Sequence, residues 1–480
     1  MTKHLIRVTL FAAAVAGLLV ACVSAPGPAP ESTRAWLAGD HHIHSRYSVG
    51  WDQEQDPPAP IVGGDAIYPI PMNALMARNF GLSWMVATDH GGPNHSKINM
   101  EMAYPEMVQS RLVVPEVIQF VGLELNSPGA DHSSTIIPHS HDEAAQLFEL
   151  ESRFDRLEEF PLNPARENPS LMLEALQVMN GMQRKPVVIA HHPSRSAEAM
   201  GVYGLYEPAE IRDWNDTAPN IAVGMEGAPG HQALALAKNG SVTRDAPRGG
   251  YGRFPSMGGF DQMTARLGGF WDSLLAEGRR WWITSNSDSH VHYTEGGADF
   301  WPGEYSKTYV YADKDYQDIL DGIRNGRVFV TLGDLISGLF VSVEAGEQQA
   351  AIGGELELPR GTDIRVTIRF LDPEGNNHRG ENPEVQRVDL IMGNVTGPSQ
   401  DRSLDINATT RVVKRFSAAD WRRAGQWRVM THSINDLDGP AYIRVRGTNT
   451  DELEPAEDSR LEDPWSDLWF YSNPVFISTH

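Results

Sequence analysis

The chain has 480 residues, a length that predicts two or three domains, or one large barrel with an appended domain. Hydrophobic residues make up 41% of it and charged residues 21%, which excludes wholesale disorder, and its single cysteine excludes an intramolecular disulfide. Because 63 acidic residues outnumber 40 basic ones, the net charge is −23, and we expect no nucleic-acid partner.

The first residues of the chain are typical of a bacterial export signal. Lys3 and Arg7 precede an apolar stretch over residues 11–20, which is too short to span a bilayer. The stretch ends in Leu-Val-Ala-Cys, which is similar to the bacterial lipobox and puts Cys22 at the lipidated position. An ordinary secretory signal cut nearby is the alternative. We predict a signal peptide over residues 1–21, a Pro-rich tether over residues 22–35, and an envelope protein, periplasmic or outer-membrane associated, that touches the membrane only through its lipid.

Residues 36–333 show short apolar runs that alternate with longer amphipathic stretches, a pattern typical of repeated β-α units. We expect strands at residues 83–88, 117–123, 186–190, 221–225 and 281–285, and helices at residues 71–80, 171–183 and 316–325. Histidines and carboxylates directly follow several of the apolar runs. In α/β folds this is the ligand-binding end of the sheet or barrel.

A glycine-rich segment interrupts this pattern. Residues 224–269 hold eleven of the 44 glycines, and a long loop of this kind inside a compact domain predicts a lid or a substrate-shaping insertion. A surface excursion without function is the alternative. The aromatic residues in and just after this segment could bury an apolar ester group: Tyr251, Phe254, Phe260, Phe270 and Trp271.

Residues 334–480 predict a smaller all-β domain that resembles a sandwich. Short apolar or alternating runs are separated there by Gly, Pro, Asn and Asp, which favours strands joined by turns. The expected strands are residues 340–343, 363–370, 386–392, 410–416, 426–431, 441–446 and 468–477.

The histidines of the first domain suggest a metal site, because thirteen of the 17 lie between His41 and His292. Alternate residues on a strand point to one face, so His42 and His44 can reach the same ion. Asp288 and His290 repeat this spacing with a carboxylate and an imidazole. Imidazole and carboxylate ligands without a thiolate favour Mn, Zn or Fe.

The order of these motifs is similar to that of the PHP (polymerase and histidinol phosphatase) superfamily. The resemblance lies in His42-x-His44, Ala-Thr-Asp-His90, Gly-x-Glu124, His192-Pro and Asp288-x-His290. It implies a distorted (β/α)7 barrel over residues 36–333, two or three divalent metal ions at the strand ends, and hydrolysis of phosphate esters. By the resemblance, His42, His44, Glu124 and Asp288 hold a first ion, Glu124, His132 and His192 a second, and His90 and His290 help to hold a third.

Two positions depart from the family pattern. Members carry an Asp or His a few residues after the His-x-His motif, where this chain has Val49. Asp52 or His95 are the candidate substitutes, and otherwise we expect a weak third site that phosphate strengthens. Two histidines, not one, precede the proline of the His-Pro motif. We assign His192 as the ligand and His191 to a supporting or substrate-contacting role.

The resemblance implies a hydroxide held between two ions that share Glu124, so no covalent nucleophile is needed. Arg195 is expected to grip a phosphoryl oxygen, although a surface arginine paired with an acid is the alternative. We expect Asp89 to orient a ligand.

The substrate expected for an acidic exported protein is a small organic phosphate ester, a diester rather than a monoester because of the aromatic residues near the glycine-rich segment. An amidohydrolase-type barrel is disfavoured because Glu124 stands where that family has a lysine. A non-catalytic envelope binding lipoprotein is the alternative from another class. The oligomeric state is left open.

Overall fold

A computed structural model of the chain describes residues 33–251 and 253–480. The predicted signal peptide, Cys22 and most of the predicted tether lie outside these residues. Residues 34–480 form one compact unit. No helix of the described part combines the length and apolar character needed to cross a bilayer.

Seven strands lie side by side at one end of a large mixed sheet. In sheet order they are β1 (Ala35–Ile43), β4 (Trp84–Ala87), β5 (Ile118–Asn126), β6 (His132–Ile136), β7 (Val187–Ala190), β8 (Ala222–Ala228) and β9 (Trp282–Ser285). Neighbouring strands are parallel, except that β6 is antiparallel to both β5 and β7. The apolar runs in β4 and β7 are buried along their whole length, as strands covered on both faces require. All five strands expected from the apolar runs are present.

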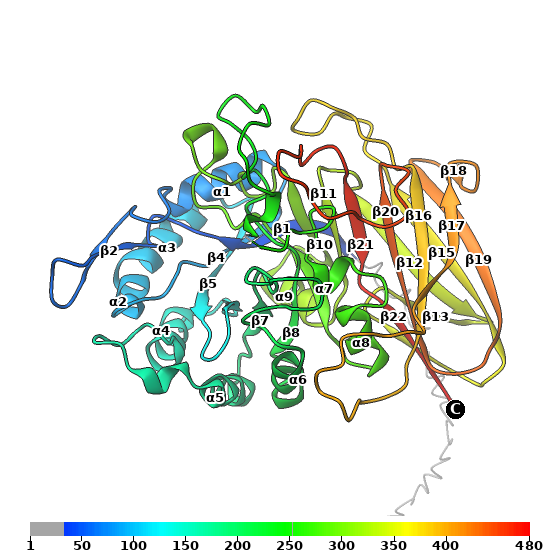
Figure 1. Cartoon of the computed structure of the whole chain (residues 1–480), viewed down its shortest axis with the longest axis horizontal. Coiled ribbons are helices and arrows are strands. Elements are labelled where there is room, and N and C mark those ends of the chain that lie inside the picture. The colour runs from blue at the N-terminus through cyan, green and yellow to red at the C-terminus, as the bar shows by residue number, and fades with distance from the viewer. Residues whose placement is uncertain (1–32, 252) are drawn as a thin grey trace, which may run out of the picture. The chain divides into compact units, whose positions relative to one another are not determined.

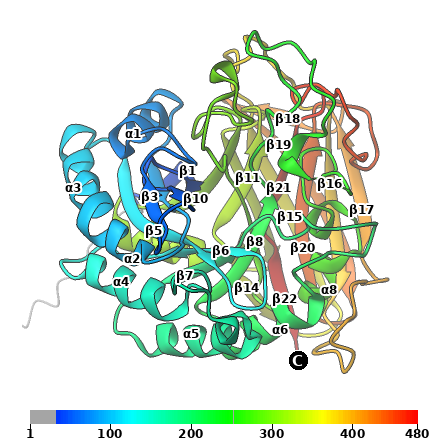
Figure 2. The same cartoon turned by 60° about the vertical axis from the view of Figure 1, so that its left-hand side comes forward.

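Helices lie around the large sheet, most of them beside these seven strands (Figures 1 and 2). They are α1 (Ile70–Asn79), α2 (His95–Ile98), a π-helical turn (Asn99–Ala103), α3 (Tyr104–Val113), α4 (Glu143–Phe154), α5 (Pro169–Gly181), α6 (Pro208–Thr217), α7 (Gln262–Ala265), α8 (Phe270–Ala276) and α9 (Tyr316–Arg324), with short 3-10 turns at Pro164–Glu167, Arg248–Gly250 and Tyr293–Glu295. The three expected helices correspond to α1, α5 and α9. The side chains of Asn168 and Asp315 cap the first turns of α5 and α9.

The sheet curls, but it does not close. Strand β10 (Ser306–Ala312) pairs antiparallel with β1 and with β11 (Val328–Leu332). The Ser285 N–H in β9 donates to Thr308 Oγ1 in β10 at 2.8 Å, and that hydroxyl donates to Ser285 O at 2.6 Å. The curl therefore brings β9 beside β10, yet no backbone ladder joins them in the described part of the chain. The architecture is a curled, mixed α/β sheet, and a closed barrel is not observed.

Residues beyond 333 form strands only, as expected. Strands β14 (Glu355–Leu358), β16 (Arg387–Asn394), β17 (Arg411–Ser417), β20 (Ala441–Thr448), β21 (Trp469–Ser472) and β22 (Val475–Thr479) extend the large sheet to fifteen strands. A second sheet holds β12 (Gly338–Ala345), β13 (Gln348–Ala351), β15 (Thr362–Leu371), β18 (Arg422–Ala424) and β19 (Trp427–Leu437). These strands gather in yellow to red in Figure 1. The single strand expected at residues 468–477 is two strands, because Asn473 and Pro474 interrupt it. Strand β21 pairs with β11, so one sheet runs through both halves of the chain.

The glycine-rich segment is anchored in the interior. Arg248 is fully buried and pairs with Asp458 at 2.8 Å, Asp467 at 2.5 Å and Glu462 at 3.1 Å. The five aromatic side chains expected to shape a substrate pocket are at most 8% exposed and belong to the core: Tyr251, Phe254, Phe260, Phe270 and Trp271. The expectation that they surround an apolar ester group is wrong, because their rings pack against the protein itself.

Candidate metal centre

The first set of expected ligands comes together at the ends of β1, β5 and β9. The Nε2 atom of His42 lies 3.2 Å from Glu124 Oε1 and 3.0 Å from Asp288 Oδ1. The Nε2 atom of His44 lies 3.3 Å from Glu124 Oε2 and 3.1 Å from the same Asp288 oxygen. All four side chains are buried. The His-x-His spacing thus places both imidazoles on one pair of carboxylates, as the strand periodicity predicts.

The charges of this set call for a cation. His42 Nδ1 lies 2.7 Å from Glu226 Oε1, and this contact turns the other ring nitrogen, Nε2, toward the ligand set. His42 Nε2 lies 3.0 Å from His44 Nε2 and also faces the two carboxylates. Glu124 Oε2 and Asp288 Oδ1 are buried without a hydrogen-bond donor. Buried acceptors that face one another are costly unless a positive charge lies among them, so these residues fit a divalent metal ion.

The second set surrounds Glu124 Oε1, which His42 also contacts. His132 Nδ1 on β6 lies 3.0 Å from Glu124 Oε1, and His192 Nε2 after β7 lies 3.1 Å from it. His191 Nδ1 approaches the same oxygen at 2.9 Å, and its ring stacks on His42 with centroids 3.6 Å apart. His191 therefore lies among the potential ligands, whereas the sequence predicts a supporting or substrate-contacting role for it.

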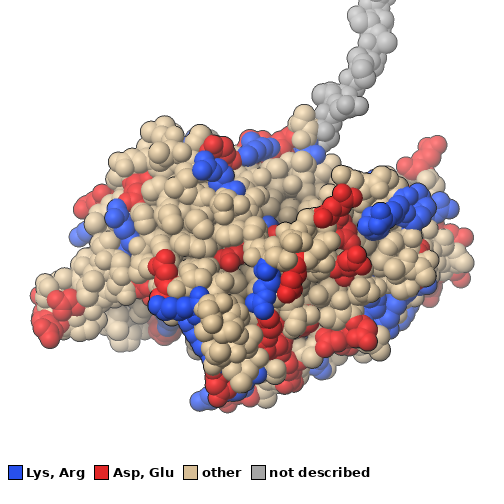
Figure 3. All heavy atoms as spheres, turned by 90° about the horizontal axis from the view of Figure 1, so that it is seen from above, with Lys and Arg blue, Asp and Glu red and all other residues tan. Residues whose placement is uncertain are grey.

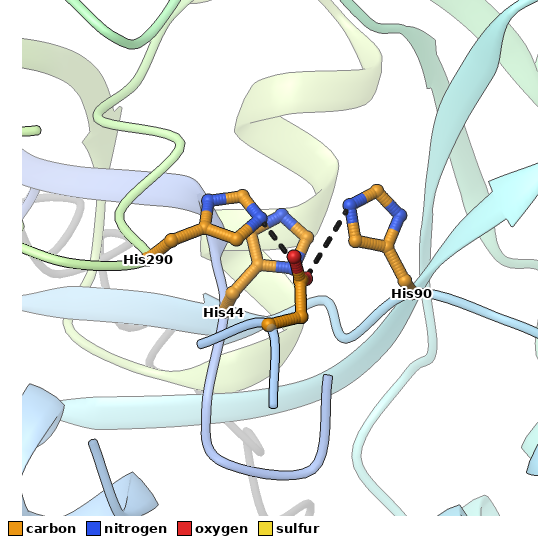
Figure 4. Close-up of side chains that lie close together, drawn as sticks. His44, His90 and His290 are labelled. Atoms are coloured by element: carbon orange, nitrogen blue, oxygen red, sulfur yellow. Dashed lines mark ion pairs between the residues drawn. The ribbon is translucent and has the colours of Figure 1, made fainter. Parts of the chain in front are cut away.

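A third set lies on the cavity side of His44. The imidazoles of His44, His90 and His290 gather around the carboxylate of Asp65 (Figure 4). Asp65 Oδ2 is 3.4 Å from His290 Nε2 and 3.9 Å from His90 Nε2. His90 Nδ1 also lies 2.9 Å from Glu124 Oε2, which joins this set to the other two.

Both substitutes expected for the residue at Val49 are wrong. The carboxylate of Asp52, in the hairpin strand β2 (Gly50–Asp52), accepts from Gln55 at 2.7 Å. The ring of His95 bonds to Glu151 at 2.6 Å and to the carbonyl of Tyr47 at 2.7 Å. Neither side chain takes part in the third set.

The remaining expected site residues lie at the edge of the centre. Arg195 Nη2 pairs with Asp131 Oδ1 at 2.5 Å, and 34% of the Arg195 side chain is exposed. The carboxylate of Asp89 accepts from the backbone and the hydroxyl of Ser45, at 2.5 and 2.8 Å. Asp89 thus fixes the turn that follows His44, and it does not bond a histidine ring directly.

Burial and charge favour the metal-binding forms of Glu124 and His191. Although burial opposes it, His90, His132 and His42 hold the pKa of Glu124 well below its usual range. Burial and the neighbouring His42 lower the pKa of the His191 imidazole well below its usual value. A carboxylate that stays ionised and an imidazole that stays neutral are the forms that bind metal.

Three residues of the site were missed from the sequence. Glu226 directly follows the expected strand at residues 221–225, which is the signal that identified Glu124, so it could have been found. His231 Nε2 lies 2.9 Å from Asp288 Oδ2, and its Nδ1 lies 2.5 Å from Asp299 Oδ1. Neither His231 nor Asp65 follows a strand directly, and no local pattern marks them.

A cavity of about 320 Å³ opens over the centre. Its walls are mostly charged or polar, and among the described residues no Phe, Tyr or Trp lines it. The lining residues are Asp65, His90, Glu124, Arg195, His231, Asp288, His290, Val291, Gly297, Ala298 and Asp299.

No protein-family model matches the chain, and no curated protein sequence matches it. Among solved structures, 26% of the chain is similar to a crystal structure of a chitin binding domain from Burkholderia pseudomallei, at 9% identity and a TM-score of 0.15. The chain spans 57% of the length of that structure. A TM-score this low supports no conclusion about fold or function.

Proposed function

We propose that the protein is a metal-dependent hydrolase of small organic phosphate esters, with a PHP-type barrel that stays open between β9 and β10. One observation carries the proposal. Glu124 Oε1 lies within 3.2 Å of four imidazole nitrogens, from His42, His132, His191 and His192, while its other oxygen faces His44 and His90. A single carboxylate shared in this way suits a bridge between two ions.

The residues that would hold the ions follow from the sets described above. His42, His44, Glu124 and Asp288 would hold one ion, and Glu124, His132 and His192 a second, with His191 beside them. When bound, Mn, Zn or Fe ions would ionise a water near neutral pH and neutralise the charge that grows on phosphoryl oxygens.

Residues of the chain itself would bind and orient the ester. Arg195 lines the cavity and is held at one nitrogen by Asp131, so its planar guanidinium is positioned to donate to a phosphoryl oxygen. His231 is held by Asp299 and in turn contacts Asp288, which keeps that carboxylate turned toward His42.

A phosphodiester and a phosphomonoester are both candidate substrates, and one observation favours the monoester. The aromatic side chains that would bury a second ester group lie in the core, and the cavity wall is polar. On the face drawn in Figure 3, acidic and basic side chains are interspersed. Together with the net charge of −23, this supports a small molecule rather than a nucleic acid as partner.

Turnover of chromogenic esters tests the proposal. The purified full chain is loaded separately with Mn, Zn or Fe and supplied with p-nitrophenyl phosphate or bis-p-nitrophenyl phosphate. We expect metal-dependent release of p-nitrophenol, abolished by a chelator and restored by metal. Metal-loaded protein that turns over neither ester would favour the non-catalytic envelope binding protein.

A further inference from the structure

The third set of candidate ligands contains a carboxylate at a position where the family motifs have none. Asp65 Oδ2 lies 3.4 Å from His290 Nε2 and 3.9 Å from His90 Nε2, and it accepts a hydrogen bond of 2.7 Å from Ser48 Oγ. Donor atoms of His44, Asp65, His90 and His290 lie within 4.8 Å of one another. Because His44 belongs to the first set, this spacing leaves the imidazoles of His90 and His290 and the carboxylate of Asp65 for a third ion.

The orientation of His290 turns its second ring nitrogen toward Asp65. His290 Nδ1 lies 2.9 Å from the carbonyl oxygen of Asp288, and Nε2 faces Asp65 Oδ2. An ion placed among His290 Nε2, Asp65 Oδ2 and His90 Nε2 would accept an electron pair from each, while the His290 Nδ1 hydrogen stays on the Asp288 carbonyl (Figure 4).

The backbone holds Asp65 in place through contacts with the segment that follows His44. After this segment the chain forms the hairpin of β2 and β3 (Ala59–Ile61). Residues 63–66, which follow the hairpin, lie beside residues 46–48. Gly63 N–H donates to Arg46 O at 2.8 Å, and Ala66 N–H donates to Ser48 O at 3.3 Å. A Cβ on Gly64 would come within 2.8 Å of the Gly50 backbone, so only glycine allows this close approach. Asp65 is therefore built into the site by its neighbours on both sides.

We infer that Asp65 is the carboxylate ligand of a third metal ion and replaces the ligand that the family carries at the position of Val49. The inference rests on the proposed metal-dependent function and names a further residue of the same site. With Asp65 in place, the third set carries its own negative charge, so binding of the ion does not require phosphate. This reverses the expectation of a weak third site.

Metal content of the full chain tests the inference without relying on activity. Wild type, Asp65→Ala and Asp65→Asn are loaded with Mn alone or Zn alone, dialysed in phosphate-free buffer, and analysed for metal per chain. Asp52→Asn is the matched control, since Asp52 lies in the same hairpin but bonds only to its own turn. Thermal unfolding checks that each variant is folded, and Asp65→Asn preserves the side-chain shape if Asp65→Ala unfolds.

We expect three ions in wild type and Asp52→Asn, and two in both Asp65 variants. Three ions in a folded Asp65 variant, or only two in wild type, would overturn the assignment of Asp65 while the two-ion hydrolase stands. No bound ion in wild type would instead contradict the proposed function itself, so the two failures are distinguishable.

Discussion

Glu226 Oε1 lies 2.7 Å from His42 Nδ1, and Glu226 Oε2 accepts the backbone N–H of His192 at 2.5 Å. One fully buried carboxylate thus orients a histidine of the first ligand set and fixes the backbone of a histidine in the second. A carboxylate that accepts the second ring hydrogen of a metal-binding histidine fixes its tautomer and raises its basicity. Glu226 is therefore a positioning residue for both sets.

Substitution Glu226→Gln should lower metal affinity without unfolding the protein. An amide has one acceptor oxygen, so either His42 Nδ1–H or the His192 N–H loses its partner. We expect affinity for the first two ions to fall about 10- to 100-fold, measured by competition with a chromogenic chelator.

The matched control is Glu151→Gln. Glu151 is equally buried and also bonds a histidine, His95 at 2.6 Å, outside the ligand sets. Wild-type affinity in Glu226→Gln, or an equal loss in Glu151→Gln, would show that Glu226 has no specific role at the centre.

Arg195→Met should weaken phosphate binding and leave the metal content unchanged. A charge-assisted hydrogen bond to an anion contributes roughly 1.5–3 kcal/mol, so we expect inhibition by inorganic phosphate to weaken about tenfold or more. Arg460→Met, at a side chain that is 61% exposed, is the control. An unchanged inhibition constant in Arg195→Met would mean that the guanidinium serves only its pair with Asp131.

Arg248→Met should destabilise the protein strongly. Arg248 is buried with Asp458 and Asp467, and its loss leaves carboxylates without a counter-charge in the interior. We expect a decrease of about 3–5 kcal/mol in the free energy of unfolding, measured in urea. Arg78→Met breaks an exposed pair with Glu116 and should cost about 1 kcal/mol or less. Equal decreases in the free energy of unfolding for the two substitutions would show that burial does not make the Arg248 ion pairs more costly to break.

Cys22→Ser should release the protein from membranes, because a hydroxyl cannot carry the thioether-linked lipid. Membrane and periplasmic fractions are separated and probed for the protein. Ser24→Ala, two residues further along, should leave the wild-type distribution unchanged. A Cys22→Ser protein that stays in the membrane fraction would contradict lipidation at this residue.

Much of the α/β half could be predicted because its signals are local. An apolar run followed by a polar residue predicts both a strand and a side chain at its end, and the sequence therefore pointed to His42, Glu124 and Asp288. Strand β6 lacks such a run, because its His-Ser-Ser-Thr-Ile is polar although four of its five residues are buried. It was therefore not among the expected strands.

Features set by long-range contacts could not be predicted. Asp65 reaches the centre because Gly64 packs on Gly50, and no periodicity in the sequence encodes that contact. The pairing of β11 with β21 joins residues more than a hundred positions apart, which merges sheets that local patterns treat as separate. The prediction for the aromatic residues near the glycine-rich segment was wrong because composition does not show whether an aromatic side chain lies in the core or lines a pocket.

The most direct test is the metal content of purified wild type beside Glu124→Ala and Asp288→Ala, each checked for cooperative thermal unfolding. Glu124 contacts histidines of every ligand set, whereas Asp288 contacts those of the first and third. We expect at least two ions per chain in wild type, loss of both from Glu124→Ala, loss of the first ion from Asp288→Ala, and no ester hydrolysis by either variant. Wild type without bound metal, or a folded Glu124→Ala that keeps its full metal content and activity, would contradict a metal centre built on Glu124.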